Sequence, residues 1–343
     1  MEEGERKHMT RYLSAGARKR IDAMLHGNSV DRLPITFWTH FVGEDLEAGA
    51  LCQATVRYQQ EYQLDLVKVS PCGLYSVLDY GCTLTFPPDG TPPVVDRYAV
   101  NQEEDWSRLP SPRFAEASAL QEQIKAIARI RAELGEAQPI IATVFSPLTT
   151  LRKLATPQAF DEAVTSALPA FCSVLTQVTE ITSELSAAYI QNGADGIFFA
   201  TQCATADVCS REQYEQFGLP YDLAALERLS EDARRYSMLH LHGDQIYFDI
   251  EAHYPLSMVS WHDQRTAPSL AEAQHLTSKV LVGGLDRDTL TILSTEDALA
   301  LEKRLVGGVK RPMLLAPSCV LRPNMPAQTL HVLRQAVETW EFS

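Results

Sequence analysis

The sequence lacks the features of an exported or membrane-spanning chain. Its N-terminus reads M-E-E-G-E-R-K-H-M-T-R-Y, which contains no apolar core of the kind that a signal peptide needs. No segment reaches about 18 uninterrupted apolar residues, so the sequence predicts no transmembrane helix. We therefore expect a cytoplasmic protein.

Basic stretches are also missing. The chain carries 44 acidic residues against 30 Lys and Arg residues, which gives a formal net charge of −14. It has no basic run and no interleaving of aromatic and basic residues. Nucleic acid and anionic membrane are therefore unfavourable partners on electrostatic grounds, and a small-molecule substrate is the expected ligand.

Two further motifs are absent. The seven cysteines form no C-x-x-C pair, which excludes a zinc ribbon. Their number is odd and the chain is long, so reduced thiols are expected. No G-x-G-x-x-G turn follows the first apolar run, which disfavours an open, doubly wound dinucleotide-binding sheet.

What the sequence does contain is an alternation of short apolar runs with longer amphipathic stretches. Runs of this length are typical of buried parallel strands. Eight of them, alternating with helices, predict an α/β fold, namely a single (β/α)8 TIM barrel over residues 1–343. The expected strands are residues 35–41, 65–70, 140–145, 195–200, 238–242, 256–261, 280–284 and 313–317. The expected helices are residues 47–62, 114–134, 161–192, 223–236, 269–278, 295–305 and 326–340.

Two segments stand outside this alternation. Residues 1–30 are expected to form a helical extension at the N-terminus. Residues 81–112 contain three proline-rich patches and little periodicity. They predict a long excursion after the second strand, in the form of a hairpin or a lid over the barrel.

Catalytic groups of such barrels come from the carboxyl ends of the strands, so polar and aromatic residues near these ends are the candidate site residues. The candidates for proton transfer are His40, Lys68 and His262, and those for substrate binding are Trp38, Ser146, Gln202, Trp261 and Asp286. For Lys68 the alternative is an ion pair with an acid of a neighbouring strand, and for the tryptophans it is burial in the core. A general-base pair of His262 with Asp263 is disfavoured, because adjacent residues of a strand face opposite ways.

The segment M-L-H-L-H-G-D, residues 238–244, carries two histidines two positions apart. Side chains two apart on a strand share one face, so His240 and His242 are expected to point together into the barrel mouth. Cys319, just after the last strand, would supply a third ligand. Three ligands of N and S type with an open fourth position describe a catalytic zinc site that holds a thiol substrate as its thiolate. The alternative is a polar mouth lined by two histidines, with a small buried cysteine nearby.

Several segments resemble motifs of the uroporphyrinogen decarboxylase superfamily, in the same order along the chain. Four lie in the late strands: H-L-H-G-D (240–244), V-S-W (259–261), V-G-G-L-D-R-D-T-L (282–290) and S-C-V-L-R-P-N-M-P (318–326). The others are D-R-L-P-I (31–35), F-S-P-L-T (145–149), G-A-D-G-I-F-F (193–199) and Y-E-Q-F-G-L-P (214–220). Ser260 stands where the family pattern has Asp, and Cys319 where it has His. The resemblance spans almost the whole chain and implies a (β/α)8 barrel.

The resemblance implies two kinds of chemistry. Decarboxylases of the superfamily work without metal or cofactor, hold tetrapyrrole carboxylates with N-terminal arginines and use an aspartate after the second strand. This chain has T-F-W-T-H-F-V-G-E-D (36–45) at the first place and Pro71 at the second. Arginine is the residue suited to bidentate carboxylate binding, so these differences disfavour porphyrinogen decarboxylation.

Corrinoid-linked methyltransferases of the superfamily bind zinc through a His-x-Cys pair and a distant Cys. By this resemblance His240 matches the histidine, Cys319 matches the distant Cys, and His242 replaces the near Cys. The leading hypothesis is a zinc-dependent methyltransferase whose thiol substrate receives a methyl group from a corrinoid on a partner protein or from a small donor. The alternatives are a metal-free decarboxylase or lyase acting on a small or tetrapyrrole carboxylic acid, and a non-catalytic ligand-binding component of a complex. A homodimer is implied by the resemblance alone.

Overall fold

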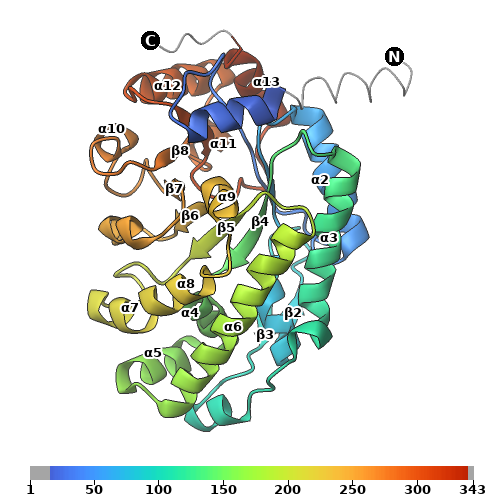
Figure 1. Ribbon diagram of the computed structural model, residues 1–343, viewed down its shortest axis with the longest axis vertical. Coiled ribbons are helices and arrows are strands. Elements are labelled where there is room, and N and C mark those ends of the chain that lie inside the picture. Colours follow the sequence, from blue (N-terminus) through green and yellow to red (C-terminus); the bar gives the residue numbers. More distant parts are fainter. Residues whose placement is uncertain (1–15, 339–343) are drawn as a thin grey trace.

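Parallel strands form the centre of the molecule. The computed structural model describes residues 16–338 and contains a curled sheet of seven parallel strands (Figure 1). Almost every strand residue is buried, as the continuous apolar runs predict for a sheet covered on both faces. The α/β class and the parallel sheet are therefore confirmed. In sheet order the strands are β1 (Val67–Val69), β4 (Ile140–Phe145), β5 (Gly196–Thr201), β6 (Met238–Leu241), β7 (Met258–Trp261), β8 (Val280–Leu285) and β9 (Met313–Pro317).

A short segment near the N-terminus bridges the gap between β9 and β1. Ile35 forms a parallel bridge with Leu315 of β9, and its carbonyl accepts a 3.0 Å hydrogen bond from the amide of Asp65, just before β1. The predicted regular strand over 35–41 is wrong, because pairing is limited to this bridge. The Trp38 carbonyl instead accepts a hydrogen bond from a backbone amide of the loop after β9. The chain therefore leaves the hydrogen-bonding pattern of the sheet after the bridge.

Helices cover the outside of the sheet (Figure 1). Residues 16–25 are helical, and residues 1–15 of the expected N-terminal extension lie outside the described residues. The following α-helices of the described residues are α2 (Ala48–Tyr62), α3 (Ser118–Leu134), α4 (Pro147–Leu154), α5 (Pro157–Ser166), α6 (Pro169–Gln191), α7 (Arg211–Phe217), α8 (Leu219–Ala225), α9 (Glu231–Tyr236), α10 (Leu270–Ala273), α11 (Thr289–Ile292), α12 (Thr295–Gly307) and α13 (Ala327–Ala336). The 3-10 helices are η1 (Tyr75–Tyr80), η2 (Glu103–Arg108), η3 (Phe114–Glu116) and η4 (Phe248–His253).

Some helix predictions are wrong in detail. The single helix expected over 161–192 is two helices, because Ala167 adopts a left-handed conformation with φ 50° and Pro169 starts α6. Residues 223–236 likewise belong to α8 and α9, with a break between them. Helix α4 was not expected. It begins because the Ser146 side chain accepts from the Thr149 amide and a proline follows Ser146 at the first helical position.

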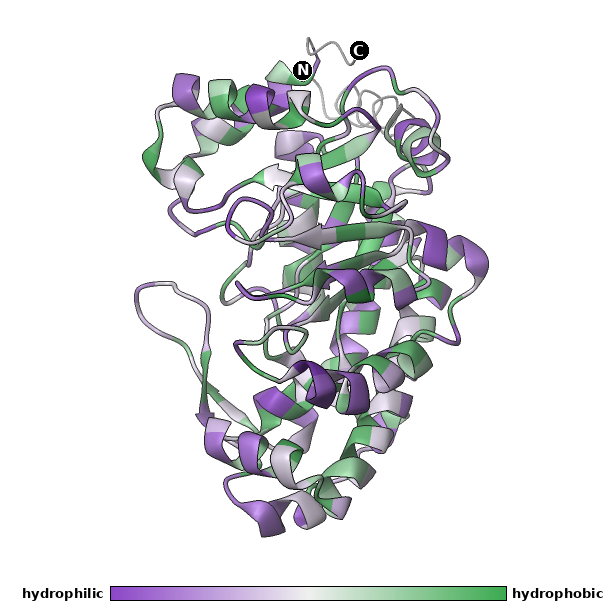
Figure 2. Ribbon diagram, turned by 90° about the vertical axis from the view of Figure 1, so that its left-hand side faces the viewer, coloured by the Kyte–Doolittle hydropathy of each residue, from purple (hydrophilic) through white to green (hydrophobic). Residues whose placement is uncertain are grey.

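The excursion over residues 81–112 contains an antiparallel hairpin. Its strands are β2 (Thr83–Thr85) and β3 (Val94–Arg97), with an irregularity between Thr83 and Leu84. The hairpin extends from the body as a narrow loop at the left of Figure 2. Whether it acts as a lid stays a prediction.

A buried polar network joins the end of β5 to the helices outside it. The hydroxyl groups of Tyr214 and Tyr254 each donate to Oδ2 of Asp222 over 2.7 Å, and the Tyr214 hydroxyl lies 3.1 Å from Oγ1 of Thr201. All four residues are buried, and burial raises the pKa of Asp222 to about 7. The network therefore fixes the strand end that leads into Gln202.

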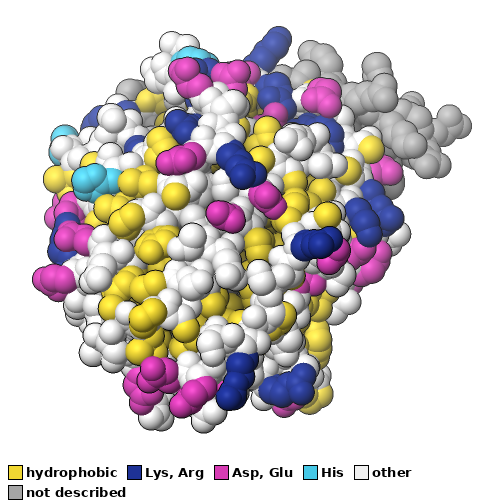
Figure 3. Space-filling model, turned by 60° about the horizontal axis from the view of Figure 1, so that its bottom comes forward, with side chains coloured by type: hydrophobic (Ala, Val, Ile, Leu, Met, Phe, Trp, Pro, Cys, Tyr) yellow, Lys and Arg dark blue, Asp and Glu magenta, His cyan; other side chains and the backbone are white. Residues whose placement is uncertain are grey.

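The outer surface is mixed in charge. Acidic and basic side chains are interspersed over the face drawn in Figure 3, with hydrophobic side chains visible between them. Among the described helices, none combines the length and the apolar character that a membrane crossing requires.

Candidate metal centre

Four side chains meet at the carboxyl edge of the sheet. One ligand atom each of His240, His242, His262 and Cys319 lies within 4.8 Å of the others. His240 belongs to β6, His242 and His262 directly follow β6 and β7, and Cys319 follows β9. Because the ends of parallel strands meet at one edge, the sequence brings these residues together from three separate segments. The three predicted metal ligands thus lie together, and His262 joins them.

The neighbours of the histidines orient two of the rings. Nδ1 of His240 lies 3.0 Å from Oγ of Ser260, its register partner on β7, which leaves Nε2 for the cluster. The Phe198 ring stacks on His240 with 5.0 Å between ring centroids. Nδ1 of His242 lies 3.7 Å from Sγ of Cys319. The buried Nε2 of His262 finds no hydrogen-bond partner among the described residues.

The protonation states suit metal binding. Burial alone would raise the pKa of Cys319, but the neighbouring imidazoles of His240, His242 and His262 outweigh it and hold that pKa well below its ordinary value. Burial lowers the pKa of His240 to about 4. A thiolate and a neutral imidazole are the forms that bind a metal ion.

The donor set and its spacing fit zinc. Tetrahedral zinc with bonds of about 2.0–2.3 Å places its ligand atoms roughly 3.3–3.8 Å apart. The present spread of up to 4.8 Å is larger by about one ångström, which small side-chain rotations would close. The Nε2 atom of His262 also fits a metal site. It is buried and has no hydrogen-bond partner among the described residues, and buried polar atoms rarely lack a partner.

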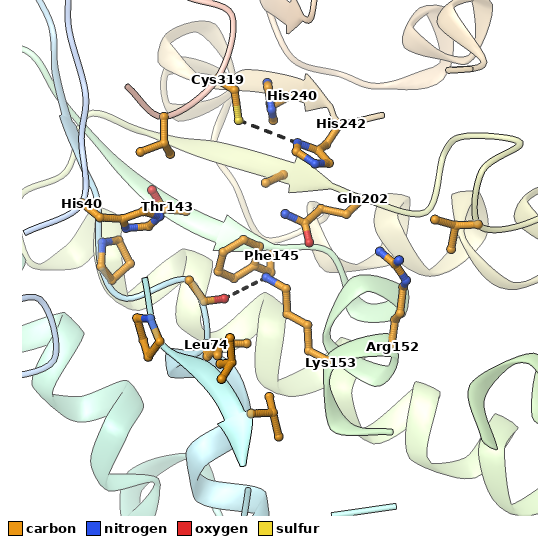
Figure 4. Close-up of a pocket in the computed structure, with 18 of the residues that line it drawn as sticks. His40, Leu74, Thr143, Phe145, Arg152, Lys153, Gln202, His240, His242 and Cys319 are labelled. Carbon is orange, nitrogen blue, oxygen red and sulfur yellow. Dashed lines mark hydrogen bonds between the residues drawn. The ribbon is translucent and has the colours of Figure 1, made fainter. Parts of the chain in front are cut away.

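A cavity of about 660 Å³ opens beside the cluster. Figure 4 shows His240, His242 and Cys319 at one wall, with Phe145, Lys153 and Arg152 toward the opposite side. Of the other predicted site residues, Trp38, His40, Lys68 and Gln202 line this cavity. The hairpin contributes Pro93, Val94 and Val95 to its lining, with Tyr98 just beyond.

Three predicted substrate-binding residues do not line the cavity, as far as the described residues show. Ser146 caps α4. Trp261 is fully buried, and its indole donates to the Pro268 carbonyl over 2.7 Å. Asp286 is paired with Arg265 over 2.9 Å, and its carboxylate accepts from the start of α11.

Lys68 does not form the ion pair considered as its alternative. Its Nζ donates to Oγ of Ser70 over 3.0 Å and lies 4.6 Å from the centroid of Phe198, and no acidic group of the described residues lies within 4.0 Å. Burial lowers the pKa of Lys68 to about 7, against the opposing effect of Cys319. The amino group of Lys68 therefore faces the cavity without an acidic partner among the described residues.

His40 lies across the cavity from the cluster (Figure 4). Its Nδ1 is 3.7 Å from Oδ2 of Asp45. Burial, followed by the charge of Lys68, lowers the pKa of His40 to about 4, and burial raises the pKa of Asp45 to about 7. His40 is therefore neutral at neutral pH and is a weaker base than an ordinary histidine.

Comparisons with known proteins place the fold. The family model described as uroporphyrinogen decarboxylase (URO-D) matches residues 17–340. The chain belongs to this family. The resemblance found in its motifs is thereby confirmed, and with it the TIM-barrel class of fold. No curated protein sequence gives a significant match to this URO-D family chain.

Solved structures share the fold of this URO-D family member. A methyltransferase from Methanosarcina mazei has a TM-score of 0.78 at 20% identity, covering 94% of this chain and 98% of that chain. A B12-independent methionine synthase from Shewanella sp. W3-18-1, in complex with selenomethionine, has a TM-score of 0.55 at 15% identity, covering 89% and 93%. A putative B12-independent methionine synthase from Listeria monocytogenes has a TM-score of 0.52 at 12% identity, covering 86% and 87%.

Sequence analysis missed the contribution of α4 to the site. Arg152 and Lys153 of this helix line the cavity, as do Thr143 and Phe145 of β4. The available signal was the dipeptide Arg152-Lys153, which follows the F-S-P-L-T turn and begins seven residues after the end of the predicted strand 140–145. Because so short a helix gives weak periodicity, this signal was not used.

Proposed function

We propose that the chain is a zinc-dependent methyltransferase that activates a thiol substrate at the mouth of its barrel. The observation that carries this proposal is the convergence of His240, His242, His262 and Cys319 beside a cavity large enough for a small substrate. The shared fold with a methyltransferase and two methionine synthases supports it.

His240, His242 and Cys319 would hold the metal, which leaves the fourth position for the substrate thiol, with His262 close beside the site. Zinc, when bound, supplies Lewis acidity that lowers the pKa of a thiol in contact with it. Ser260 keeps the His240 ring in place through its contact with Nδ1. Cys319 and His240 are buried, so little of either side chain is exposed to solvent.

The transfer itself forms one bond and breaks one. The substrate sulfur takes the methyl group as the bond between that group and its donor breaks, and the thiol proton is lost. His40 lines the same cavity and is neutral at neutral pH, but its pKa of about 4 makes it a weak base, so it would pass this proton on to solvent rather than retain it. The donor would be a corrinoid carried by a partner protein or a small methylated molecule.

The test is the zinc content of protein purified without a histidine tag. We expect close to one zinc per chain in the wild type and its loss in His240→Ala and Cys319→Ala. His253→Ala is the matched control, since His253 is exposed and lies outside the cluster. A wild-type protein that takes up no zinc under reducing conditions would refute the proposal.

A second candidate function is favoured by the basic side chains of the cavity, which have no acidic partner among the described residues. Lys68, Arg152 and Lys153 would also suit a metal-free decarboxylase or lyase that acts on a carboxylic acid. The two functions differ in their response to a chelator. Turnover of a carboxylic acid that survives complete removal of zinc would support this candidate against the methyltransferase.

A further inference from the structure

Two of the seven cysteines lie in one loop at the wall of the cavity. Cys203 and Cys209 belong to the segment that joins β5 to α7, and both are free thiols with 0% and 2% of their surface exposed. Neither takes part in the proposed function. Gln202 and Val208, each next to one of these cysteines, line the cavity. The pair is therefore placed to influence the cavity wall.

Backbone contacts fold this loop so that its two ends lie close together. The Thr205 carbonyl accepts from the Cys209 amide over 3.1 Å, so the chain makes one tight turn between the cysteines. Tyr247 spans the two ends of the loop. Its amide donates to the Ala204 carbonyl over 3.0 Å, and its hydroxyl donates to the Cys209 carbonyl over 2.8 Å. The backbone beside Cys203 and the backbone at Cys209 are thus held within the length of one tyrosine.

The two thiols interact with each other and differ in acidity. Thr149 adds a contact from α4, since its Oγ1 lies 4.0 Å from Sγ of Cys203. The neighbouring Cys203 lowers the pKa of Cys209 against the opposing effect of burial, and the charge of Arg152 acts in the same direction as Cys203. Burial, followed by Cys209, raises the pKa of Cys203 well above its ordinary value. Cys209 therefore forms a thiolate more readily, and Cys203 keeps its proton.

We propose that Cys203 and Cys209 are a redox-sensitive pair, which a peroxide converts into a disulfide that stiffens the wall of the cavity. The Cys209 sulfur attacks one oxygen of hydrogen peroxide, the O–O bond breaks, and the second oxygen leaves as water after taking up a proton. The Cys203 sulfur then attacks the resulting sulfenic acid at Cys209, and the hydroxyl group leaves with the Cys203 proton as a second water. Two thiols are oxidised to one disulfide while one peroxide is reduced to two waters. Exchange with a small thiol restores the reduced pair.

The loop is close to the molecular surface and in contact with the next strand end. Ala206 and Asp207, which lie between the two cysteines, are exposed, so a small oxidant has a short path to the buried sulfur atoms. The Asp207 carboxylate accepts from the amides of Asp244 and Gln245 over 3.0 and 3.2 Å. A crosslink across the loop thus restrains the segment that follows β6 as well. The inference goes beyond the proposed function and needs no zinc.

The test is a peptide map of peroxide-treated protein. After the remaining thiols are alkylated, the unfolded chain is cleaved before aspartate without a reductant. This cleavage places Cys203 in the peptide 195–206 and Cys209 in the peptide 207–221, each with no other cysteine. We expect the two peptides to be recovered as one linked species that dithiothreitol separates. Two separate alkylated peptides would overturn the proposal.

The map is made on the wild type and on Cys319→Ala without zinc. The low pKa of Cys319 makes that thiol a competing target for peroxide, and the variant removes it. A linked pair in both proteins, together with no zinc uptake by the wild type, would refute the proposed function and leave this inference standing. The wild-type map needs no substitution in the loop, so it decides the proposal even where a variant fails to fold.

Variants assign the order of the two steps. In Cys203→Ala we expect peroxide to leave Cys209 as a sulfenic acid that dimedone labels, whereas in Cys209→Ala we expect Cys203 to stay unlabelled. Cys172→Ala is the matched control, because Cys172 is a half-buried cysteine of α6, and it should leave the linked peptides unchanged. An unlabelled Cys209 in the first variant, or a link of either loop cysteine to a different cysteine, would overturn the proposal.

Hydrogen exchange measures the effect on the cavity wall. A crosslink reduces the freedom that the loop gains when it opens, so the amides of Asp244 and Gln245 should exchange more slowly in the oxidised protein. Reduction should restore the original rate. Cys203→Ala treated in the same way is the control and should show no slowing. Unchanged exchange in protein that carries the disulfide would refute the stiffening of the wall.

Discussion

Replacing Asp222 by Asn should reduce the pH dependence of stability. The carboxyl group is buried, receives hydrogen bonds from two tyrosine hydroxyls, and has a pKa raised from 3.8 to about 7 by burial. The folded chain thus holds this proton more tightly than the unfolded chain does. The resulting stability is fully present below about pH 4 and is lost as the pH rises through about 7.

The size of the effect follows from the shift. A change from 3.8 to about 7 corresponds to about 4 kcal/mol over the whole range, at about 1.4 kcal/mol per pH unit, and to about 3 kcal/mol between pH 5 and pH 8. Asn cannot titrate. The wild type should therefore lose about 3 kcal/mol more than Asp222→Asn over this interval. Other titrating groups are common to both proteins and cancel in the comparison.

The measurement is urea unfolding of both proteins at pH 5 and pH 8, with a chelator present so that metal binding contributes nothing. The variant should be less stable at low pH, because its amide nitrogen replaces a buried carboxyl oxygen that has no partner among the described residues. Asp232→Asn is the control, since its side chain is 86% exposed and stays in water on folding. Parallel pH profiles for the wild type and Asp222→Asn would refute the reasoning.

Two further substitutions test the residues that support the proposed metal centre. Ser260→Ala removes the contact to Nδ1 of His240 and should lower zinc affinity by roughly tenfold to a hundredfold in competition with a chelator, whereas Ser257→Ala should not. Gly243→Ala places a Cβ atom 2.7 Å from Oγ1 of Thr205, at a backbone φ of 134° that strains any residue other than glycine. We expect it to lower the free energy of unfolding, measured in urea, by about 1–3 kcal/mol and to displace the neighbouring His242. Gly90→Ala, at a positive φ with nothing near its Cβ, should cost less, and an equal loss in both would contradict the steric argument.

The sequence predicted the parts of the site that depend on strand ends. Cys319 and the two histidines of the H-L-H segment lie together because their positions follow directly from β6 and β9. Seven of the eight expected strands form. Their near-continuous apolar runs are typical of parallel strands that are buried on both faces of a sheet.

What could not be predicted depends on tertiary contacts. The sequence predicted His262 as a proton-transfer residue and not as a member of the cluster. His262 follows the last residue of β7, and the fold brings it to the cluster while Trp261 points into the core. The missing counterion of Lys68 is likewise invisible in a sequence, because it depends on which acids the fold brings near. The helix that presents Lys153 was too short for its periodicity to be recognised.

The bridge between Ile35 and Leu315 also bears on how the chain acquires its structure during synthesis. Nearly the whole polypeptide separates these two residues, so their pairing closes a very long loop and must wait until β9 has left the ribosome. Trp38 and His40, which follow the bridge, line the same cavity as Cys319, which follows β9. The nascent chain therefore carries an incomplete pocket until its last strand arrives, and ligand binding in a translation-arrest series should appear only once residues beyond Cys319 are exposed.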